Sequence, residues 1–423
     1  MERNRWTESL ASWCCLLVLS VGSGQAIAQQ AGQDWPQLLG PNRNGISAET
    51  GLLKKWPADG PKEAWRVPGG VGMSAVSISQ GRAVTMIQAG GKQSVIALDA
   101  KTGKQLWKTD VADEYRNSMG NGPRATPTIA GDAIYVFTGQ GILAALKSGD
   151  GTLLWKQDVL AELGGKPAAY GMASSPLVVG DLVVTTAGTN SGCVVALARA
   201  TGKVVWKTGS GAAGYSSPTL RTVGGTEQIV AFTGTAALGI SPKSGDELWS
   251  YPYKTAYDCN IAVPLEFKGR VFISSGENHG SSMLSLQPSG DRFTVKETWT
   301  SHGSSSVLRN EWQTSMLLDG KLYGLDNSGS AGPITHLTCV DAADGKRLWQ
   351  QGRFGKGNLI AADGKLFIVT IKGDLVVVRA NPEKFEELGR AKILGFTRQA
   401  PSLANGLLYL RDDKEIVCLD VRE

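Results

Sequence analysis

Short apolar segments alternate with glycine-containing turns through most of the chain. Residues 133–138 (AIYVFT) and 142–146 (ILAAL) are two such segments, and Gly131-Asp132 and residues 139–141 lie beside them as turns. Apolar runs of this length between glycines are typical of β-strands, because tight two-residue hairpins need positive φ angles. We find no helical periodicity of useful length. The pattern therefore predicts an all-β protein built from short antiparallel strands.

A tryptophan that follows a glycine-containing turn recurs along the chain. The eleven-residue windows ALDAKTGKQLW and ALARATGKVVW align without gaps and end at Trp107 and Trp206. Further copies, one of them stretched and one partial, end at Trp155, Trp249, Trp299, Trp349 and Trp65. Trp65 and Trp349 are 284 residues apart, which makes six steps of about 47 residues. A period of 40–50 residues with strand-like units indicates a propeller or a solenoid.

Each repeat has the pattern of four strands, and eight groups of three strands can be counted. These groups begin near Ala75, Thr126, Ser175, Ser217, Val263, Ser315, Leu359 and Pro401. Seven of them are followed by a fourth strand. The eighth reaches the C-terminus without one, whereas the strand around Trp65 has no group before it. We therefore predict an eight-bladed β-propeller of four-stranded antiparallel blades over residues 61–423, closed by pairing of the N- and C-terminal strands. The repeated tryptophans should fill the gaps between blades.

The first 28 residues have the features of a secretory signal peptide. Arg3 and Arg5 precede an apolar stretch from Leu10 to Val21, and Ala26-Ile27-Ala28 is an A-x-A cleavage signal. This apolar stretch is too short to cross about 30 Å of hydrocarbon as a helix. We expect export to the periplasm or cell envelope after cleavage near Ala28, with no transmembrane segment. Residues 29–60 then form an extended leader in front of the propeller.

Composition and charge exclude several classes of function. Glycine makes up 54 of 423 residues, only 19% are charged, and the net charge of +5 is scattered along the chain. A weak and dispersed positive charge does not predict a nucleic-acid partner. The cysteines outside the signal peptide are Cys193, Cys259, Cys339 and Cys418. They are widely separated, so neither a disulfide scaffold nor a C-x-x-C-H haem site is predicted.

The A-L-D-x-x-T-G-x-x-x-W window resembles the pyrroloquinoline-quinone (PQQ) repeat. That repeat builds the eight-bladed propellers of quinoprotein alcohol dehydrogenases, and it also occurs in the propeller lipoprotein of the outer-membrane β-barrel assembly machine. The leader from Asp34 to Trp56, with the segments GPRATP, GYSSP and FGKGNLIAADG, is similar to exported PQQ-like repeat proteins of undefined function. The resemblance covers nearly all of residues 60–421. It implies the propeller fold, but it does not name a function, because the repeat specifies blade packing.

The direction of the strands places a candidate site at the mouth of the central channel. The loops between blades and those between second and third strands emerge on one face, and the first strand of each blade should be innermost. Residues just before these first strands should ring the mouth: Met73, Arg124, Ala173, Tyr215, Ile261, Trp312, Lys356 and Arg398. One position earlier adds Asn260 and Glu311. Three cations and two aromatic residues at a concave mouth suit an anionic, planar or polar ligand.

Two long loops on the same face, at residues 275–282 and 326–336, bring Glu277, Asn278, His279, Asp326, Asn327 and His336 to this sector. The histidine spacing does not predict a metal site. An alternative is that Arg124 and Lys356 pair with Glu311 or Asp258 and hold loops. Trp312 would then act as a plug over the mouth.

Two main functions remain open. The first is a non-catalytic binding scaffold, a monomer whose partner at the mouth is an unknown anionic small molecule or an envelope protein. Arg124, Tyr215, Asn260, Trp312, Lys356 and Arg398 are the predicted binding residues. Outer-membrane assembly is a subcase, and the poor lipidation sequence before Cys14 counts against it.

The alternative follows from the resemblance and is a PQQ-dependent oxidoreductase. It would hold PQQ with calcium at the mouth and use Asp258 or Glu311 as the base that oxidises an alcohol or sugar. Against it, Cys14-Cys15 in the signal peptide is the only pair of adjacent cysteines, whereas these enzymes usually carry such a pair above the cofactor. The large inserted loops of these enzymes are also absent. No motif supports a hydrolytic or lyase reaction, which remains a third possibility.

Overall fold

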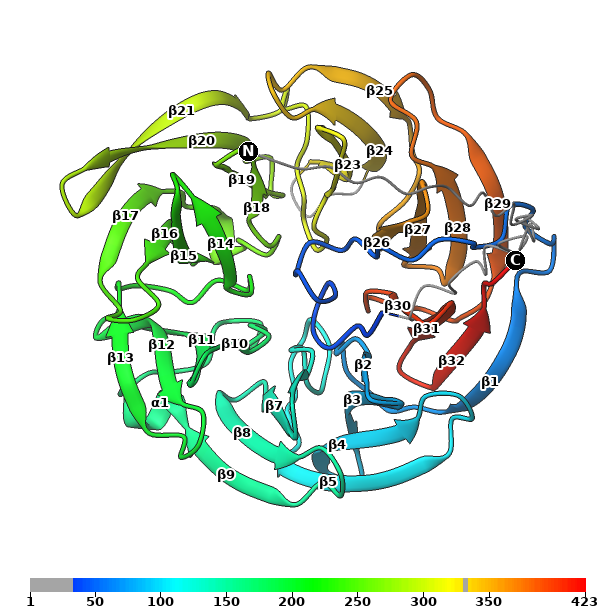
Figure 1. Cartoon of the computed structure of the whole chain (residues 1–423), viewed down its shortest axis with the longest axis horizontal. Coiled ribbons are helices and arrows are strands. Elements are labelled where there is room, and N and C mark those ends of the chain that lie inside the picture. Colours follow the sequence, from blue (N-terminus) through cyan, green and yellow to red (C-terminus); the bar gives the residue numbers. More distant parts are fainter. Residues whose placement is uncertain (1–32, 330–333) are drawn as a thin grey trace, which may run out of the picture. The chain divides into compact units, whose positions relative to one another are not determined.

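The computed structural model describes residues 33–329 and 334–423, and these form a ring of eight four-stranded sheets (Figure 1). Every strand pair within a sheet is antiparallel, as in β7 (Ala133–Phe137) beside β8 (Ile142–Lys147). The eight-bladed propeller predicted from the sequence is confirmed. The predicted signal peptide lies outside the described residues.

The strands occupy the same place in each blade. The first strands are β2 (Ser77–Ser79), β6 (Thr128–Ala130), β10 (Leu177–Val179), β14 (Thr219–Val223), β18 (Leu265–Phe267), β22 (Met316–Leu318), β26 (Gly357–Ala362) and β30 (Ser402–Ala404). The second strands are β3 (Arg82–Ala89), β7, β11 (Leu182–Thr189), β15 (Thr226–Phe232), β19 (Arg270–Ser275), β23 (Lys321–Ser328), β27 (Lys365–Thr370) and β31 (Leu407–Arg411). First strands of neighbouring blades contact one another, which places them innermost.

The third strands are β4 (Lys92–Asp99), β8, β12 (Gly192–Ala198), β16 (Ala236–Ile240), β20 (Gly280–Ser289), β24 (Ile334–Asp341), β28 (Asp374–Arg379) and β32 (Glu415–Asp420). The fourth strands form the outer rim of Figure 1: β5 (Gln105–Asp113), β9 (Leu153–Asp158), β13 (Val204–Thr208), β17 (Glu247–Pro252), β21 (Arg292–His302), β25 (Arg347–Gln351), β29 (Glu387–Lys392) and β1 (Lys62–Pro68). A single helical turn, α1 (Val159–Glu162), follows β9, and a 3-10 turn, η1 (Ala256–Asp258), follows β17.

The two ends of the propeller share one blade. Its strand order is β1-β32-β31-β30, and Trp65 of β1 lies opposite Cys418 of β32. The predicted closure is therefore confirmed. Because β1 pairs with β32, the closing blade does not leave β32 as an unpaired edge strand at the point where the ring closes.

Burial along the strands follows their distance from the rim. All residues of β7 and β27 are buried, because both faces of an inner strand are covered by neighbouring blades. The rim strand β9 instead alternates between exposed and half-buried residues, because one of its faces meets solvent. This explains why inner strands are continuous apolar runs while the rim strands carry Lys and Asp.

The repeated tryptophans join each blade to the next. Six indole Nε1 groups donate to a backbone carbonyl in the third-to-fourth-strand turn of the next blade, at 2.8–3.3 Å. They belong to Trp65, Trp107, Trp155, Trp206, Trp299 and Trp349. Trp249 instead donates to Gln228 of its own blade at 2.5 Å, because the next blade has the long β20–β21 hairpin in place of the short turn.

The leader packs on the ring. Trp35 forms a bridge with Ile78 of β2, and Leu52 forms another with Arg422 near the C-terminus. The Glu49 carboxylate accepts hydrogen bonds from the backbone of the first-to-second-strand turn of the closing blade, at residues 405–406. These turns lie on the face opposite the inter-blade loops. In Figure 1 the leader, in dark blue, crosses the centre of the ring.

Arg43 of the leader enters the innermost layer and is only 1% exposed. Its Nη1 donates to the carbonyls of Ser175 and Pro218 at 3.1 and 2.9 Å, and its Nη2 donates to Thr128 Oγ1 at 3.2 Å and to the Pro176 carbonyl. Burial lowers the pKa of Arg43 to about 9. One side chain therefore ties together the first strands of three blades. No motif in the sequence predicts this role of Arg43.

Candidate functional site

A cavity of about 650 Å³ lies at the centre of the ring. Its wall contains all eight residues that the strand directions place at the mouth: Met73, Arg124, Ala173, Tyr215, Ile261, Trp312, Lys356 and Arg398. Leu38 and Leu39 of the leader also line the cavity, and they close it on the side opposite the inter-blade loops. The channel is therefore a cup that is open at one face.

Short polar residues fix the strands that carry this wall. Ser175 Oγ accepts from the backbone N of Thr126 at 2.9 Å, and Ser217 Oγ accepts from the backbone N of Ser175 at 2.8 Å. Thr314 Oγ1 accepts in the same way from the backbone N of Val263 at 2.9 Å. These bonds connect neighbouring blades just inside the mouth. They give a structural reason for the small polar residues before each first strand.

Trp312 forms the centre of a cationic cluster on one side of the cavity. The Lys356 Nζ lies 4.4 Å from the centroid of the indole ring, and the Arg398 guanidinium carbon lies 5.0 Å from it. Contacts of this kind are attractive because the face of an aromatic ring is electron-rich. Trp312 is half-buried and lines the cavity wall, so the tryptophan holds two cations beside the open space.

Glu311 pairs with Lys356, as one alternative from the sequence proposed. Lys356 Nζ lies 2.8 Å from Glu311 Oε2, and Asn327 Nδ2 donates to the same oxygen at 2.7 Å. Burial raises the pKa of Glu311, and the nearby Lys356 ammonium opposes that rise. Both contacts hold the carboxyl group in place, but burial outweighs them, so the pKa of Glu311 stays above its ordinary value.

Among the described residues, Arg124 forms no ion pair with an acid. Its Nε donates to the Tyr170 carbonyl at 2.6 Å and its Nη2 donates to the Gly120 carbonyl at 2.6 Å, while its guanidinium stacks over Tyr115 at 4.6 Å. Burial lowers the pKa of Arg124 to about 10. Arg124 therefore holds the loop before β6 through hydrogen bonds to neutral carbonyl groups. These groups do not neutralise the positive charge of its guanidinium.

The opposite side of the cavity is aromatic. Tyr170 stacks on Tyr215 with ring centroids 5.8 Å apart, and Tyr257 lies 6.5 Å from Tyr170. Tyr257 is 66% exposed, so its ring is available at the rim. Of these three, the sequence identified only Tyr215, because the other two lie in irregular loops outside the repeat.

Asn260 and Asp258 do not line the cavity. The Asn260 amide is buried and donates to the carbonyls of Thr233 and Tyr253 at 2.7 and 2.9 Å, while its Oδ1 accepts from Ser275 Oγ at 2.8 Å. A fully bonded amide of this kind holds the loop after β17 together. Asp258 lies in η1 behind the wall, so it is not positioned to act as a base in the cavity.

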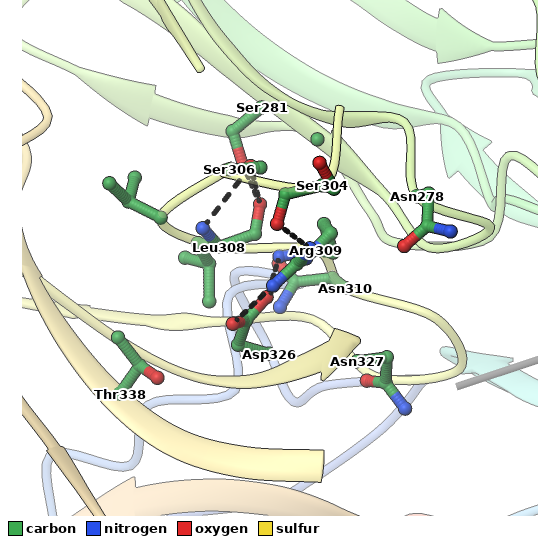
Figure 2. Close-up of polar contacts among 12 residues, drawn as sticks. Asn278, Ser281, Ser304, Ser306, Leu308, Arg309, Asn310, Asp326, Asn327 and Thr338 are labelled. Carbon is green, nitrogen blue, oxygen red and sulfur yellow. Dashed lines mark hydrogen bonds and ion pairs between the residues drawn. The ribbon is translucent and has the colours of Figure 1, made fainter. Parts of the chain in front are cut away.

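A buried ion pair supports the loop that carries Glu311 and Trp312 (Figure 2). Arg309 Nε and Nη2 donate to Asp326 Oδ1 and Oδ2 at 2.7 and 2.8 Å, and the two side chains are 4% and 0% exposed. The backbone N of Arg309 also donates to Asp326 Oδ1 at 3.0 Å. Asp326 was expected in a loop at the mouth. The structure places it in β23, where its role is structural.

His279 and His302 pack against each other and against Tyr253. The rings of His279 and His302 lie 5.2 Å apart, and His279 packs against Tyr253 with centroids 4.2 Å apart. Burial and the neighbouring His302 lower the pKa of His279. In residues 33–329 and 334–423, no group of three or more His, Cys, Asp or Glu side chains could hold a metal ion.

The residues present do not fit the calcium and PQQ arrangement implied by the resemblance. The calcium site of the quinoprotein alcohol dehydrogenases uses Glu, Asn and Asp side chains, and Asn260, Asp258 and Glu311 match no motif for it. Asn260 and Asp258 do not line the cavity, and Glu311 is paired with Lys356. The cavity wall has three cations and two carboxylates, Glu277 and Glu311. A ligand with three carboxylates would therefore enter a site with a net charge of only +1.

Comparisons with known proteins give the family. The sequence profile of the family described as "outer membrane protein assembly factor BamB" matches residues 51–214, 91–351 and 334–423 in overlapping segments. BamB of Yersinia pestis is 23% identical over 333 residues, which cover 78% of this chain and 69% of that protein. Quinohemoprotein alcohol dehydrogenase ADH IIB of Pseudomonas putida is 34% identical over 145 residues, which cover 32% of this chain and 20% of the enzyme.

Solved structures share the fold. BamB from Moraxella catarrhalis superimposes with a TM-score of 0.57 at 13% identity and covers 84% of this chain and 96% of that one. Quinohemoprotein alcohol dehydrogenase from Comamonas testosteroni gives 0.66 at 14% identity and covers 92% and 80%. No helix among the described residues is long and apolar enough to cross a membrane. Because the family profile matches across the whole propeller, the chain belongs to the family of the outer membrane protein assembly factor BamB.

Proposed function

We propose that this protein is a non-catalytic binding scaffold of the cell envelope that takes part in outer-membrane protein assembly. The Yersinia pestis relative named for that role is aligned over 78% of this chain, whereas the named dehydrogenase relative is aligned over 32% of it. The exported location expected from the first 28 residues is consistent with this role. The central cavity is the binding site in this proposal.

The observation that carries the proposal is the state of the ionisable groups around the cavity. Glu311 is held by Lys356 and Asn327, and Arg124 is bonded to backbone carbonyls. A general base must lie within hydrogen-bond reach of the proton that it takes from a substrate. Both oxygens of Glu311 are already bonded, Oε1 to Lys356 and Oε2 to Lys356 and Asn327. The arrangement therefore favours binding over a chemical step.

Photo-crosslinking in living cells of the source organism tests the proposal. A benzoylphenylalanine in place of Tyr257 puts the reactive group at the cavity rim, where the side chain is 66% exposed. The same replacement at Val205, which is 54% exposed on the rim strand β13, is the matched control. We expect position 257, and not position 205, to capture a polypeptide of the outer-membrane assembly machinery, identified by mass spectrometry.

Equal capture at both positions, or none at position 257, would contradict the proposal. A second measurement addresses the enzymatic alternative. Calorimetric titration of residues 29–423 with PQQ, with and without calcium, should give no heat. Calcium-dependent binding at micromolar concentration would overturn the non-catalytic assignment, and dye-linked assays on alcohols and sugars would follow.

A further inference from the structure

The charges around the cavity do not balance. Its wall carries the cations Arg124, Lys356 and Arg398 and the carboxylates Glu277 and Glu311, so the net charge is +1. Asp413 lies in an adjoining pocket of about 180 Å³, where its Oδ1 accepts from the backbone N of Gly72 at 3.1 Å. Arg398 lines both pockets and the charge of Asp413 acts on it, so the net charge of +1 describes the wall of the larger cavity alone.

Both arginines donate to carbonyl groups of one loop, residues 115–122, which we call the mouth loop, and Arg124 also donates to the Tyr170 carbonyl. Arg124 donates to the carbonyls of Gly120 and Gly122, and Arg398 Nη1 donates to the carbonyl of Met119. In the described part of the chain, neither guanidinium forms an ion pair with a carboxylate. The Arg398 Nε is buried and has no hydrogen-bond partner. Carbonyl groups solvate a guanidinium without neutralising it, so each arginine retains a strong preference for an anion.

The rest of the wall combines small polar residues, such as Ser175 and Ser217, with a larger apolar and aromatic surface. Tyr170 and Tyr257 form its aromatic side, and Leu38, Leu39 and Ile261 contribute apolar surface. A wholly polar anion would leave this surface without a partner. Ligand pockets of this kind bind an apolar body and use a few polar groups to orient it.

We propose that the cavity binds a ligand with a single carboxylate joined to a flat apolar group. The carboxylate lies beside Arg398 and Lys356, and the flat group lies against Tyr170 and Tyr257. One negative charge balances the net charge of the cavity wall, whereas the three carboxylates of PQQ would make the wall and ligand together strongly negative. This inference rests on the proposed binding function. The carboxylate has two sources, a free small acid or the C-terminal residue of a polypeptide.

Calorimetric titration of residues 29–423 tests the ligand class with matched probes. N-acetyltryptophan and its amide have the same shape and differ in charge. The peptide Gly-Ser-Gly-Ser-Trp, with a free or an amidated C-terminus, represents the polypeptide source. We expect at least one free acid to bind roughly tenfold or more tightly than its amide, since an added charge contact contributes about one power of ten. Binding of the small acid alone assigns the site to free acids, and binding of the peptide alone assigns it to chain termini.

Variants show whether the preference comes from the cavity. Arg398→Gln should abolish the preference for acid over amide, and Arg398→Lys should retain most of it because the charge stays. Arg292→Gln is the control, since this arginine is exposed at the start of the rim strand β21. Circular dichroism and thermal melting establish that each variant is folded. Equal binding of acid and amide, no binding of either acid, or an unchanged preference in folded Arg398→Gln would overturn the proposal. If position 257 at the cavity rim still captures a polypeptide in cells, any of these results contradicts only the proposed ligand class. The proposed binding function would then stand.

Discussion

The contact between Trp107 and Gly151 tests how the repeat holds the ring together. Gly151 lies in the third-to-fourth-strand turn of the second blade, with φ of +75°. A Cβ atom there would lie 2.5 Å from Cε3 of Trp107 and 2.7 Å from Oγ1 of Thr109. Replacing Gly151 with alanine therefore strains the backbone and pushes the Trp107 ring away from the turn. The hydrogen bond from Trp107 Nε1 to the Ser148 carbonyl, 3.2 Å long, would weaken with it.

The magnitude follows from two separable costs. A left-handed backbone costs a residue with a Cβ about 1–2 kcal/mol. Forcing extra atoms into a packed contact costs about 1–3 kcal/mol more. Gly81 is a matched control, because its φ is +74° and a Cβ there would meet nothing within 4 Å. We expect Gly81→Ala to lower the free energy of unfolding by about 1–2 kcal/mol, and Gly151→Ala by about 2–5 kcal/mol.

Equilibrium unfolding in urea, followed by circular dichroism, measures both variants. Gly151→Ala should also be made in a Trp107→Phe background, where the smaller ring leaves room for the new methyl group. The extra cost of Gly151→Ala should then fall towards that of Gly81→Ala. If both alanine variants are equally destabilised with tryptophan present, the ring does not press on the turn and the reasoning fails.

Three further predictions concern Arg43 of the leader, the ion pair between Arg309 and Asp326, and the half-buried His279. Arg43→Ala leaves buried backbone carbonyls at the starts of β10 and β14 without donors, so urea unfolding should show a loss of about 2–4 kcal/mol; an unchanged midpoint would show that the leader contributes no stability. Asp326→Asn leaves Arg309 buried without a counter-charge and should cost about 3–5 kcal/mol, while replacing both residues with apolar ones should recover much of it; a double variant as unstable as the single one would argue against this cause. Because burial depresses the pKa of His279, the stability due to its neutral form is present above its ordinary pKa of about 6.5 and is lost as the pH falls through the folded value. His279→Gln should therefore flatten the decline of the melting temperature between about pH 7 and pH 5, and an identical decline in both proteins would refute this.

The placement of the mouth residues could be predicted because it depends only on strand direction. Once the order of four strands in a blade is known, the loops on each face follow by alternation. Arg124, Trp312, Lys356 and Arg398 all line the cavity for this reason. Whether they bind a ligand stays a prediction.

The side-chain partners in the same region could not be predicted. Asn260 directly precedes a mouth residue, yet its amide is used up by the carbonyls of Thr233 and Tyr253 and by Ser275. The sequence predicts that Asp326 lies in a loop, but its carboxylate forms a buried ion pair with Arg309. In these loops, neighbouring residues point in different directions, so a shift of one position decides whether a side chain faces the cavity. The sequence does not reveal these directions, because irregular loops have no regular backbone period.

The sequence by itself determined the number of blades, their closure and the tryptophan contacts between them. These features repeat every 40–50 residues, so each copy supports the others, and the apolar strands and glycine turns that produce them are local. Trp249 is the exception, and the stretched repeat that follows it shows why.

Only the tertiary structure decided how the leader is used. Arg43 contacts the carbonyls of Ser175 and Pro218, which are 132 and 175 residues away in the sequence. Such contacts form once and have no periodic pattern that could be recognised along the chain. They depend on the closed ring, because its centre brings the first strands of separate blades within reach of one side chain. The leader also closes one end of the channel through Leu38 and Leu39, which makes the channel a one-sided cup.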